Sequence, residues 1–293
     1  MKERVLVLGS AGLIGHQVYN YLKIACDYEL FNLSHSNKIQ NDTILLDARN
    51  EKALTDQIKI IRPKYIINCI GILISGSNKD CGNAIYLNSY LPHLLVKISN
   101  EIDSKLIHIS TDCVFSGDKA EPYVEDDEKD GRGIYAKTKA LGEVTTGRHL
   151  TLRTSVVGPE LKNNGEELFH WFMNETGEIS GYKNSIWSGV TTLELAKAVK
   201  WSIDQDVRGL YNVTNNCSIN KFELLQLFKK YMKKEINIKP FYGEKVDKSF
   251  IDTRLLINYK IPSYKVMVKD MVNFMVNHSS LYSQYEVENF ESK

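Results

Sequence analysis

Residues 5–15 read VLVLGSAGLIG, and this stretch decides the fold. Its apolar start predicts a short buried strand, and Gly9, Gly12 and Gly15 follow at a GxxGxxG spacing. In such a turn the first glycine allows the tight bend, the second lets the backbone approach a pyrophosphate, and the third lets helix and strand pack closely. The helix that follows would present free N–H groups to phosphates. We therefore predict a dinucleotide site rather than an empty turn, formed by Gly9, Ala11, Gly12, Leu13, Ile14 and Gly15.

Downstream of this turn, short apolar runs alternate with amphipathic segments. The alternation predicts parallel β-α-β units, and therefore an α/β fold with a Rossmann-like, doubly wound parallel sheet covered by helices on both faces. Pro92 is expected to bend the longest helix. The predicted strands span residues 4–8, 28–33, 43–46, 65–69, 106–109 and 150–153, and the predicted helices span residues 13–24, 52–61, 84–100 and 136–146.

The regularity weakens in the second half of the chain, so we expect two regions. Residues 1–157 are predicted to form the dinucleotide-binding Rossmann domain, to which residues 190–214 return. Residues 158–189 and 215–280 are predicted to form a smaller C-terminal α/β region that binds the substrate. The last residues, 281–293, are polar and acid-rich, and we expect a frayed tail there.

Composition excludes several classes of function. The net charge is +1, so no overall field attracts nucleic acid or an anionic membrane surface. Five cysteines form no CxxC pair, which argues against a disulfide framework and against a zinc or other metal site. The N-terminus lacks the layout of a signal peptide, and the longest apolar run, residues 65–74, is too short to span a bilayer. We therefore expect a cytoplasmic protein.

The end of the second predicted strand bears on the choice of cofactor. An acidic residue usually stands there when NAD is preferred, because it binds the adenosine ribose hydroxyls. This chain instead offers Ser34, His35 and Ser36, followed by Lys38, as donors to a 2′-phosphate. We predict NADPH as the cofactor, with NADH as the alternative. Asp47 could bind the adenine amino group, or it could belong to the N-cap region of the next helix.

A second signal lies in the predicted helix after the fifth strand. Tyr135 and Lys139 are four residues apart, so they share one helix face. A phenol has a pKa of about 10, and a nearby cation brings that pKa closer to neutrality. Thr111 ends the preceding strand, at the sheet edge where ligands bind in open α/β sheets. A second YxxxK pair, at Tyr19 and Lys23, lies in the first helix and is attributed to chance.

Taken together, the motifs resemble the extended short-chain dehydrogenase/reductase superfamily, and within it the dTDP-4-dehydrorhamnose reductase family. The resemblance covers about residues 3 to 275. The segments that carry it are VLVLGSAGLIG, IINCIGI, LNSYLPHLL, HISTDCVFSG, YAKTKALGEV, LRTSVVG and IWSGVTTLELAKAV, in the order that the family has them. Several of these variants are similar to a branch that handles 6-deoxy-4-keto sugars for polysaccharide precursors.

The resemblance implies a catalytic triad of Thr111, Tyr135 and Lys139. Tyr135 would protonate the C4 carbonyl oxygen of the sugar, Thr111 would orient that carbonyl, and Lys139 would hold the nicotinamide ribose and tune Tyr135. Asn88 would support the site from the neighbouring helix, unless it is merely a polar residue satisfied by backbone. The resemblance adds Ala48, Cys69, Ile70, Gly71 and Asn88 to the expected cofactor contacts, together with Tyr135 and Lys139.

The sugar pocket departs from the family pattern. Cys113 replaces an aromatic residue, and Val156-Val157 stand where relatives have a tryptophan. Trp187, Lys183 and Arg132 could replace those contacts, or they could serve only in packing or as solvated charges. Arg254 could bind the diphosphate of the substrate, or it could form a surface salt bridge. The expected substrate contacts are Asp112, Cys113, Arg132, Trp187 and Arg254, with Lys183 as a further cation.

We therefore expect an NAD(P)H-dependent enzyme that reduces the 4-keto group of a dTDP- or UDP-linked 6-deoxy-4-keto-hexose. A 4,6-dehydratase is disfavoured because Cys113 replaces the carboxylate that such enzymes carry after the Thr-Asp pair. A nucleotide-sugar epimerase with bound NAD and a non-catalytic nucleotide-binding subunit remain alternatives. The sequence leaves a homodimer open.

Overall fold

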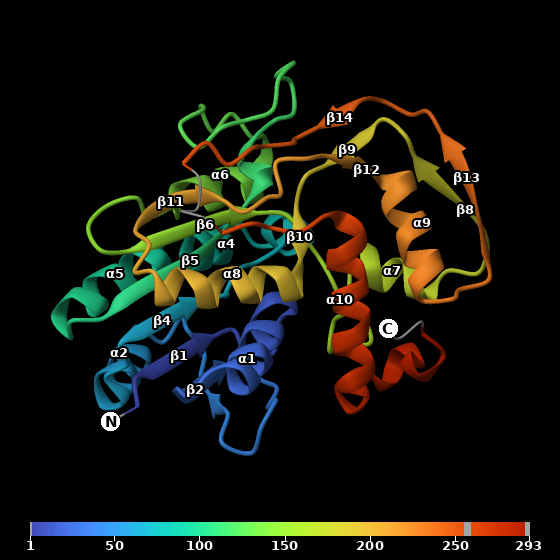
Figure 1. Ribbon diagram of the computed structural model, residues 1–293. Helices are drawn as coiled ribbons and strands as arrows, with labels where there is room; N and C mark the ends of the chain where they lie inside the picture. Colours follow the sequence, from blue (N-terminus) through green and yellow to red (C-terminus); the bar gives the residue numbers. More distant parts are fainter. Residues whose placement is uncertain (1, 255–258, 291–293) are drawn as a thin grey trace.

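Seven parallel strands form the central sheet of the computed structural model, which describes residues 2–254 and 259–290. Their order across the sheet is β11-β6-β5-β4-β1-β2-β3 (Figure 1). This arrangement confirms the predicted Rossmann-like, doubly wound α/β fold. The strands are β1 (Arg4–Leu8), β2 (Glu29–Ser34), β3 (Ile44–Leu45), β4 (Tyr65–Asn68), β5 (Lys105–Thr111), β6 (Leu150–Thr154) and β11 (Gly209–Asn212).

The strand order reverses beside β1. This strand pairs with β2 on one side and with β4 on the other, so that Leu8 stands next to both Leu33 and Asn68. The chain continues from β1 toward one edge of the sheet and from β4 toward the other. Ligands of open α/β sheets bind at the carboxyl ends of the strands where the order reverses. The glycine turn lies at that point.

Alternating side chains of β1 supply the cores on the two faces of the sheet. Val5 and Val7 face α1 (Leu13–Ala25) and α8 (Thr192–Asp204), which pack side by side (Figure 1). Leu6 and Leu8 face α2 (Glu51–Ile61) and α5 (Leu91–Glu101). The period of two is that of a strand buried on both faces.

The predicted helix 84–100 contains a widened turn. The structure has α3 (Ile74–Lys79), α4 (Cys81–Ala84), a π-helical segment (Ile85–Tyr90) and then α5, in which Pro92 occupies the first turn. Pro92 has no N–H to donate to the carbonyl of Asn88, which is consistent with an altered turn there. The predicted helix 136–146 is α6 (Gly133–Leu141), which begins and ends earlier than expected.

The segments between β6 and α8 and after β11 build a smaller layer to one side of the sheet (Figure 1). β8 pairs with β13, β9 pairs with β12 and β14, and β7 pairs with β10. The division of the chain into two regions stays a prediction. The elements are β7 (Val156–Val157), α7 (Leu168–Asn174), β8 (Gly177–Tyr182), β9 (Ser185–Trp187), β10 (Val190–Thr191), β12 (Ile219–Asn220), α9 (Lys221–Tyr231), β13 (Ile236–Phe241), β14 (Val246–Asp247) and α10 (Tyr264–Asn277).

The C-terminal segment packs against the molecule, so the expectation of a frayed tail is wrong for residues 281–290. Three short 3₁₀ turns follow α10, and Tyr282, Tyr285, Val287 and Phe290 are all buried. Polar and acidic residues separate these four apolar residues along the chain, so the sequence did not show that the segment has a buried side. The last three positions, 291–293, lie outside the described residues.

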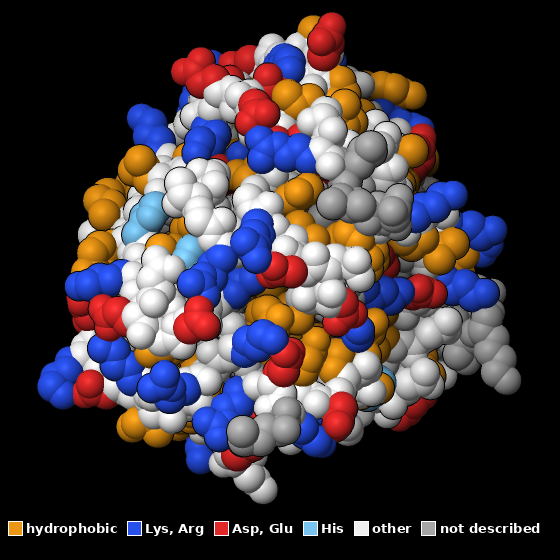
Figure 2. Space-filling model, turned by 60° about the vertical axis from the view of Figure 1, so that its left-hand side comes forward, with side chains coloured by type: hydrophobic (Ala, Val, Ile, Leu, Met, Phe, Trp, Pro, Cys, Tyr) orange, Lys and Arg blue, Asp and Glu red, His pale blue; other side chains and the backbone are white. Residues whose placement is uncertain are grey.

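Positive and negative side chains are mixed over the surface seen in Figure 2. This mixture matches a net charge of +1 and shows no field of one sign on that face. Within residues 2–254 and 259–290, no helix has the length and apolar character needed to cross a bilayer.

Candidate active site

The glycine turn has the geometry that a dinucleotide requires. Gly9 has a φ of +76°, and its N–H and that of Ser10 donate to the carbonyl of Leu33 at 2.8 and 3.0 Å. A Cβ on Gly15 would lie 2.1 Å from the carbonyl oxygen of Gly9, so only glycine lets α1 pack this closely. A Cβ on Gly12 would meet only that same oxygen, at 3.3 Å. The space over Gly12 is otherwise open, which fits the approach of a pyrophosphate.

Not all of the side chains predicted to donate to a 2′-phosphate are free to do so in the structure. His35 and Ser36 are exposed after β2, but Ser34 is buried and its hydroxyl donates to the carbonyl of Asn37. The Ser34 hydroxyl therefore stabilises its own turn and is not free to donate to a 2′-phosphate. Lys38 is exposed and reaches the carbonyl of Asn41 at 3.4 Å.

Arg49 is a residue that the sequence reasoning missed. Its guanidinium binds Asp47 through Nη2 at 2.6 Å and Nε at 3.0 Å, and it holds the pKa of Asp47 at about 2. His35 approaches the same carboxylate at 3.6 Å. The alternative role of Asp47 was a place in the N-cap region of the next helix. That cap is made by Asn50, whose side chain accepts a hydrogen bond from the N–H of Ala53. The signal available in the sequence was a basic residue two positions beyond the expected acid.

Asn88 connects two walls of the site. Its Oδ1 accepts from the N–H of Ile72 at 2.9 Å, and its Nδ2 donates to the Ile72 carbonyl at 3.1 Å. The same Nδ2 donates to Thr138 Oγ1 at 3.2 Å. Asn88 thus satisfies backbone, and it also ties the loop after β4 to α6. That loop contains Cys69, Ile70 and Gly71, while Ala48 is buried after β3.

Thr111 and Tyr135 meet at the carboxyl end of β5. Thr111 Oγ1 accepts from the N–H of Cys113 at 3.2 Å and donates to Asp112 at 3.1 Å. Tyr135 is the third residue of α6, and the Thr111 hydroxyl acts on its pKa, which indicates that the two side chains lie near each other. Lys139 lies one turn further along α6, and its Nζ donates to the carbonyl of Ile109 at 2.7 Å. The fold therefore brings the three predicted catalytic residues to the end of one strand.

The protonation of Tyr135 differs from the expectation. Burial raises its pKa above the usual value for a phenol, and the neighbouring Cys113 and Asp112 side chains act in the same direction. The Thr111 hydroxyl opposes this shift. The Lys139 ammonium, which was expected to lower this pKa, is held instead by the carbonyl of Ile109. At neutral pH Tyr135 is therefore a protonated phenol, which is the form that donates a proton.

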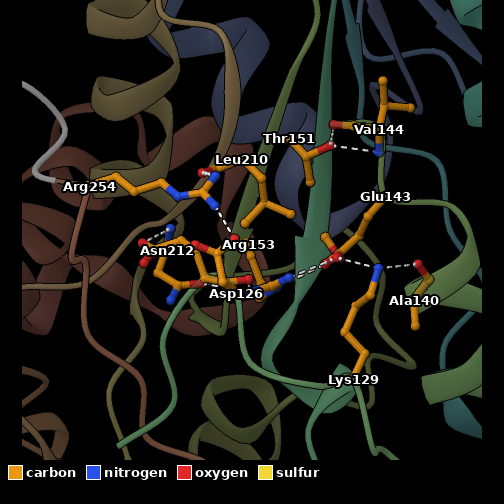
Figure 3. A network of polar contacts seen from close by, with 12 residues as sticks. Asp126, Lys129, Ala140, Glu143, Val144, Thr151, Arg153, Leu210, Asn212 and Arg254 are labelled. Carbon is orange, nitrogen blue, oxygen red and sulfur yellow. Dashed lines mark hydrogen bonds and ion pairs between the residues drawn. The ribbon is translucent and has the colours of Figure 1, made fainter. Parts of the chain in front are cut away.

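Lys139 is buried, and desolvation lowers its pKa to about 8. The carboxylate of Glu143 partly opposes this shift, because it favours the charged ammonium. Glu143 is itself held in a fully buried ion pair with Arg153, with contacts of 2.9 and 2.8 Å (Figure 3). Ser110 donates to the same carboxylate at 2.7 Å. This network fixes a negative charge beneath the active-site lysine.

The residues on the sugar side lie around Asp112 and Cys113. Burial raises the pKa of the Asp112 carboxyl and raises that of the Cys113 thiol to about 12, so Cys113 is not a reactive thiolate. Trp187 is buried, donates from Nε1 to Ser155 Oγ at 2.9 Å and packs against the ring of Tyr264. Packing is thus at least one role of Trp187.

The three candidate cations for the substrate are engaged elsewhere. Arg132 is exposed and pairs with Asp118 at 2.5 Å. Arg254 donates to the carbonyl of Leu210 at 2.8 Å and pairs with Asp126, at the edge of the sheet (Figure 3). Lys183 pairs with Glu223 at 3.3 Å and lies over the ring of Phe222. For Arg254 this is the surface salt bridge that the sequence left as an alternative, whereas for Arg132 and Lys183 the alternative was packing or a solvated charge, and the structure pairs each of them with a carboxylate.

Three other charged residues surround Asp112 and were missed. Glu167 precedes α7, Lys221 is the first residue of α9, and Lys248 follows β14. The charges of all three act on the Asp112–Cys113 segment or on Tyr135. They are far apart in the chain and belong to no motif, so only the fold brings them together.

A cavity of about 810 Å³ lies beyond Lys221, in the smaller layer of the molecule. Its walls come from α7, α9, β8 and the end of β13, and they are mainly apolar and aromatic. The principal residues that line it are Leu168, Trp171, Tyr182, Lys221, Leu225 and Phe241.

Comparison with known proteins agrees with this architecture. The family described as the RmlD substrate binding domain matches residues 2–249. The spore coat polysaccharide biosynthesis protein SpsK of Bacillus subtilis is 28% identical over 226 residues, which cover 75% of this chain and 76% of SpsK. The dTDP-4-dehydrorhamnose reductase of Escherichia coli is 26% identical over 220 residues, or 71% of each chain.

A solved structure of a relative superposes over nearly its whole length. The crystal structure of dTDP-4-dehydrorhamnose reductase from Bacillus anthracis in complex with NADP has a TM-score of 0.78 and 25% sequence identity. The match covers 92% of this chain and 99% of the other. With the family match, the sheet order and the YxxxK helix in agreement, this chain belongs to the RmlD substrate-binding-domain family of the extended short-chain dehydrogenase/reductases.

Proposed function

We propose that the protein is an NADPH-dependent reductase of the 4-keto group of a nucleotide-activated 6-deoxy-4-keto-hexose, acting in the synthesis of a polysaccharide precursor. The relatives support a reductase of sugar nucleotides, because two of them are named dTDP-4-dehydrorhamnose reductase and a third is a spore coat polysaccharide protein. The B. anthracis complex with NADP supports the choice of cofactor.

The observation that carries the proposal is the convergence of Thr111, Tyr135 and Lys139 at the carboxyl end of β5, where the Lys139 ammonium donates to the Ile109 carbonyl at 2.7 Å. A substrate carbonyl that enters this site can accept a hydrogen bond from Tyr135, and a second one from Thr111 once the Thr111 hydroxyl turns away from Asp112. Tyr135 is the better acid of the two, and its proton would go to the carbonyl oxygen as that oxygen gains negative charge. Thr111 would fix the direction of the oxygen.

Lys139 would act through position and charge. Its buried ammonium lies one helical turn from Tyr135 and has two N–H groups beyond the one given to Ile109. These groups can bind hydroxyls of a ribose, and the positive charge would stabilise the phenolate left after proton transfer. The carboxylate of Glu143, held by Arg153, would favour the charged form of this lysine.

The residues present fit a dinucleotide. The open space over Gly12 suits a pyrophosphate, and Arg49 with His35 suits a 2′-phosphate. The nicotinamide, when bound, supplies the hydride for the carbonyl carbon.

A panel of dTDP-, UDP- and GDP-linked 4-keto-6-deoxy sugars, incubated with NADPH, tests the function. We expect one nucleotide series to oxidise NADPH in a 1:1 ratio to the alcohol formed, with a single configuration at C4. Conversion of a 4-hydroxy sugar nucleotide to its epimer without net cofactor oxidation would favour the epimerase instead. Absence of turnover with every member of the panel would overturn the proposal.

A further inference from the structure

The chain that leaves β6 starts beside the reaction site, and the role inferred for it rests on the function proposed above. β5 and β6 end side by side, with Thr111 and Thr154 paired in the register of the sheet. From there residues 155–167, the wall segment, run to α7, whose Leu168 and Trp171 line the 810 Å³ cavity. The wall segment therefore extends from the catalytic strand end to the smaller layer of the molecule.

Glu160 closes the wall segment on itself and presents its backbone to another part of the chain. Its Oε1 accepts from the N–H of Glu167 at 3.0 Å. A Cβ on Gly165 would lie 2.3 Å from that oxygen, so the loop fits around the carboxylate only with glycine there. The Glu160 N–H donates to the hydroxyl of Tyr285 at 3.1 Å, and the Glu160 carbonyl accepts from Nε2 of Gln284. The C-terminal segment thus holds both backbone groups of one residue of the wall segment.

The hydroxyl of Tyr285 has a second partner, Nδ1 of His170, at 2.7 Å. Nε2 of the same imidazole lies 3.2 Å from the carbonyl of Asn163. A carbonyl can only accept, so Nε2 carries a proton, and the Tyr285 hydroxyl donates to Nδ1 of the neutral ring. The ring of Tyr285 also meets that of Phe169 edge-on, with 5.5 Å between the centres. One buried phenol therefore fixes the wall segment at two points and fixes α7 as well.

The C-terminal segment, residues 279–290, is anchored to α1 near its beginning. Tyr282 is fully buried, and its hydroxyl lies 3.2 Å from Nε2 of His16 and 3.3 Å from Oε1 of Gln17. Both partners are buried in the helix that follows the glycine turn. The segment lies outside residues 2–249, to which the family match extends. It therefore joins α1 to the wall segment through contacts that the matched part of the chain does not contain.

We propose that the C-terminal segment is a latch that holds the wall segment in place for sugar binding, and that Tyr285 is the positioning residue of this latch. Tyr285 acts through Glu160 and His170 and does not touch the substrate. Without its hydroxyl, a buried N–H and a buried imidazole nitrogen lose their partner and turn toward others. A binding site needs its walls within about 0.5 Å of the productive geometry, so even a small shift of the wall segment weakens sugar binding.

Calorimetric titration of the whole protein, loaded with NADP⁺, tests the latch. The ligand is the 4-keto-6-deoxy sugar nucleotide of the panel that the wild type binds best, and NADP⁺ has no hydride to transfer to it. The variants are Tyr285→Phe, Tyr282→Phe and Gln284→Met, the last being a milder change at a half-buried position. Tyr28→Phe is the matched control, because its hydroxyl donates to Asp204 at 3.3 Å, at the amino edge of the sheet.

We expect Tyr285→Phe to weaken sugar binding by about 3- to 10-fold, which corresponds to the loss of an ordinary hydrogen bond. Gln284→Met and Tyr282→Phe should lose about two- to fivefold, and Tyr28→Phe should match the wild type. With NADPH, the KM of Tyr285→Phe for the sugar should rise, while kcat and the Kd of NADPH stay within about twofold. A merely structural role would lower the urea midpoint without this split. Hydrogen exchange of amides 160–174 should be faster in Tyr285→Phe, with α1 unchanged.

Equal sugar affinity in wild type, Tyr285→Phe and Gln284→Met would overturn the inference, and so would an equal loss in Tyr28→Phe. A wild type that binds no sugar nucleotide of the panel would overturn it too. Titration onto the NADP⁺ form needs no turnover, so the two proposals can fail separately. Weaker sugar binding in the latch variants, without reduction by NADPH in any of the proteins, would sink the function alone. Reduction by the wild type with an unchanged Kd in the variants would sink the latch alone.

Discussion

At the scale of single residues, the protonated state of Tyr135 suits this residue to act as the acid of a carbonyl reduction. Burial holds its pKa above the usual phenol value, and the Thr111 hydroxyl only partly opposes this shift. A phenol that stays protonated at neutral pH is suited to donating a proton during reduction of a carbonyl. In the reverse direction the phenol would first have to lose that proton, which burial opposes.

Tyr135→Phe should lower turnover by about 10²- to 10⁴-fold, the usual contribution of a general acid. The change removes one oxygen and keeps the packing, so the Kd of NADPH should be unaltered. Steady-state rates with the best member of the keto-sugar panel give the first quantity, and fluorescence titration gives the second. A variant that turns over at nearly the wild-type rate would remove Tyr135 from the reaction.

Arg49 is the residue that we expect to distinguish NADPH from NADH. Its guanidinium lies beside Asp47 and His35, near the end of β2, where a 2′-phosphate would be held. Arg49→Met should weaken NADPH by about tenfold, which corresponds to one charge-assisted hydrogen bond, and should leave NADH within about twofold. Lys59→Met is the matched control, since Lys59 is an exposed cation of α2 that pairs with Glu101 and is not among the expected cofactor contacts. Equal losses for both cofactors in Arg49→Met would contradict the assignment.

At the scale of elements, the crossing of α6 with the π-helical segment positions the catalytic helix. Asn88 bonds to Thr138 within this crossing, and Ser89 donates to the carbonyl of Thr138 at 2.7 Å. A Cβ on Gly142 would lie 1.9 Å from the Asn88 carbonyl oxygen. The end of α6 can therefore approach this turn only because residue 142 is glycine.

Gly142→Ala should push α6 away from the π-helical segment and destabilise the protein by about 2 kcal/mol or more, as overpacking does. Since α6 carries Tyr135 and Lys139, kcat should fall as well. Gly82→Ala is the control, because its Cβ would meet only Asp80 at an ordinary 3.6 Å and alanine favours a helix. Urea unfolding of both variants measures the difference, and an unchanged midpoint for Gly142→Ala would show that the crossing can adjust.

The elements that sequence could predict are those fixed by local patterns. The apolar strand before Gly9, the helix after it and the strand ending at Thr111 follow from short-range periodicity and from glycine positions. Pro92 predicted a bend, but the π-helical segment before it could not be predicted, because local periodicity does not show that the carbonyl of Asn88 lies against Gly142 at the end of α6. Lys221 and Lys248 could not be predicted as neighbours of Asp112 for the same reason. They belong to no motif, and only the folded chain lets their charges act on that carboxyl group.

At the scale of the whole molecule, the C-terminal segment joins the two sides of the active-site region. The hydroxyl of Tyr282 is hydrogen-bonded to His16 of α1 at 3.2 Å, and His16 Nδ1 contacts the Gly12 carbonyl at 2.9 Å. Three residues later, the Tyr285 hydroxyl contacts His170 of α7 at 2.7 Å. The segment therefore connects the glycine turn with the helix that lines the outer cavity.

This connection makes the stability of the whole protein depend on pH through His16. Burial lowers the pKa of His16 from 6.5 to about 4, so the folded protein keeps this residue neutral where the unfolded chain would already be protonated. Between pH 6.5 and pH 4 the unfolded state binds more protons, and stability falls as the pH falls through this window. The full effect is about 3 kcal/mol, since each pKa unit corresponds to about 1.4 kcal/mol.

His16→Gln cannot gain this proton and can still accept or donate a hydrogen bond, so its unfolding free energy should fall less steeply below pH 6.5 than that of the wild type. Urea unfolding of both proteins from pH 7.5 to pH 4.5 measures the difference, which removes the contribution of carboxylates common to both. His93→Gln, at an exposed position, should follow the wild type. Parallel curves for wild type and His16→Gln would mean that burial does not hold His16 neutral in the folded protein, and that this residue does not couple pH to stability.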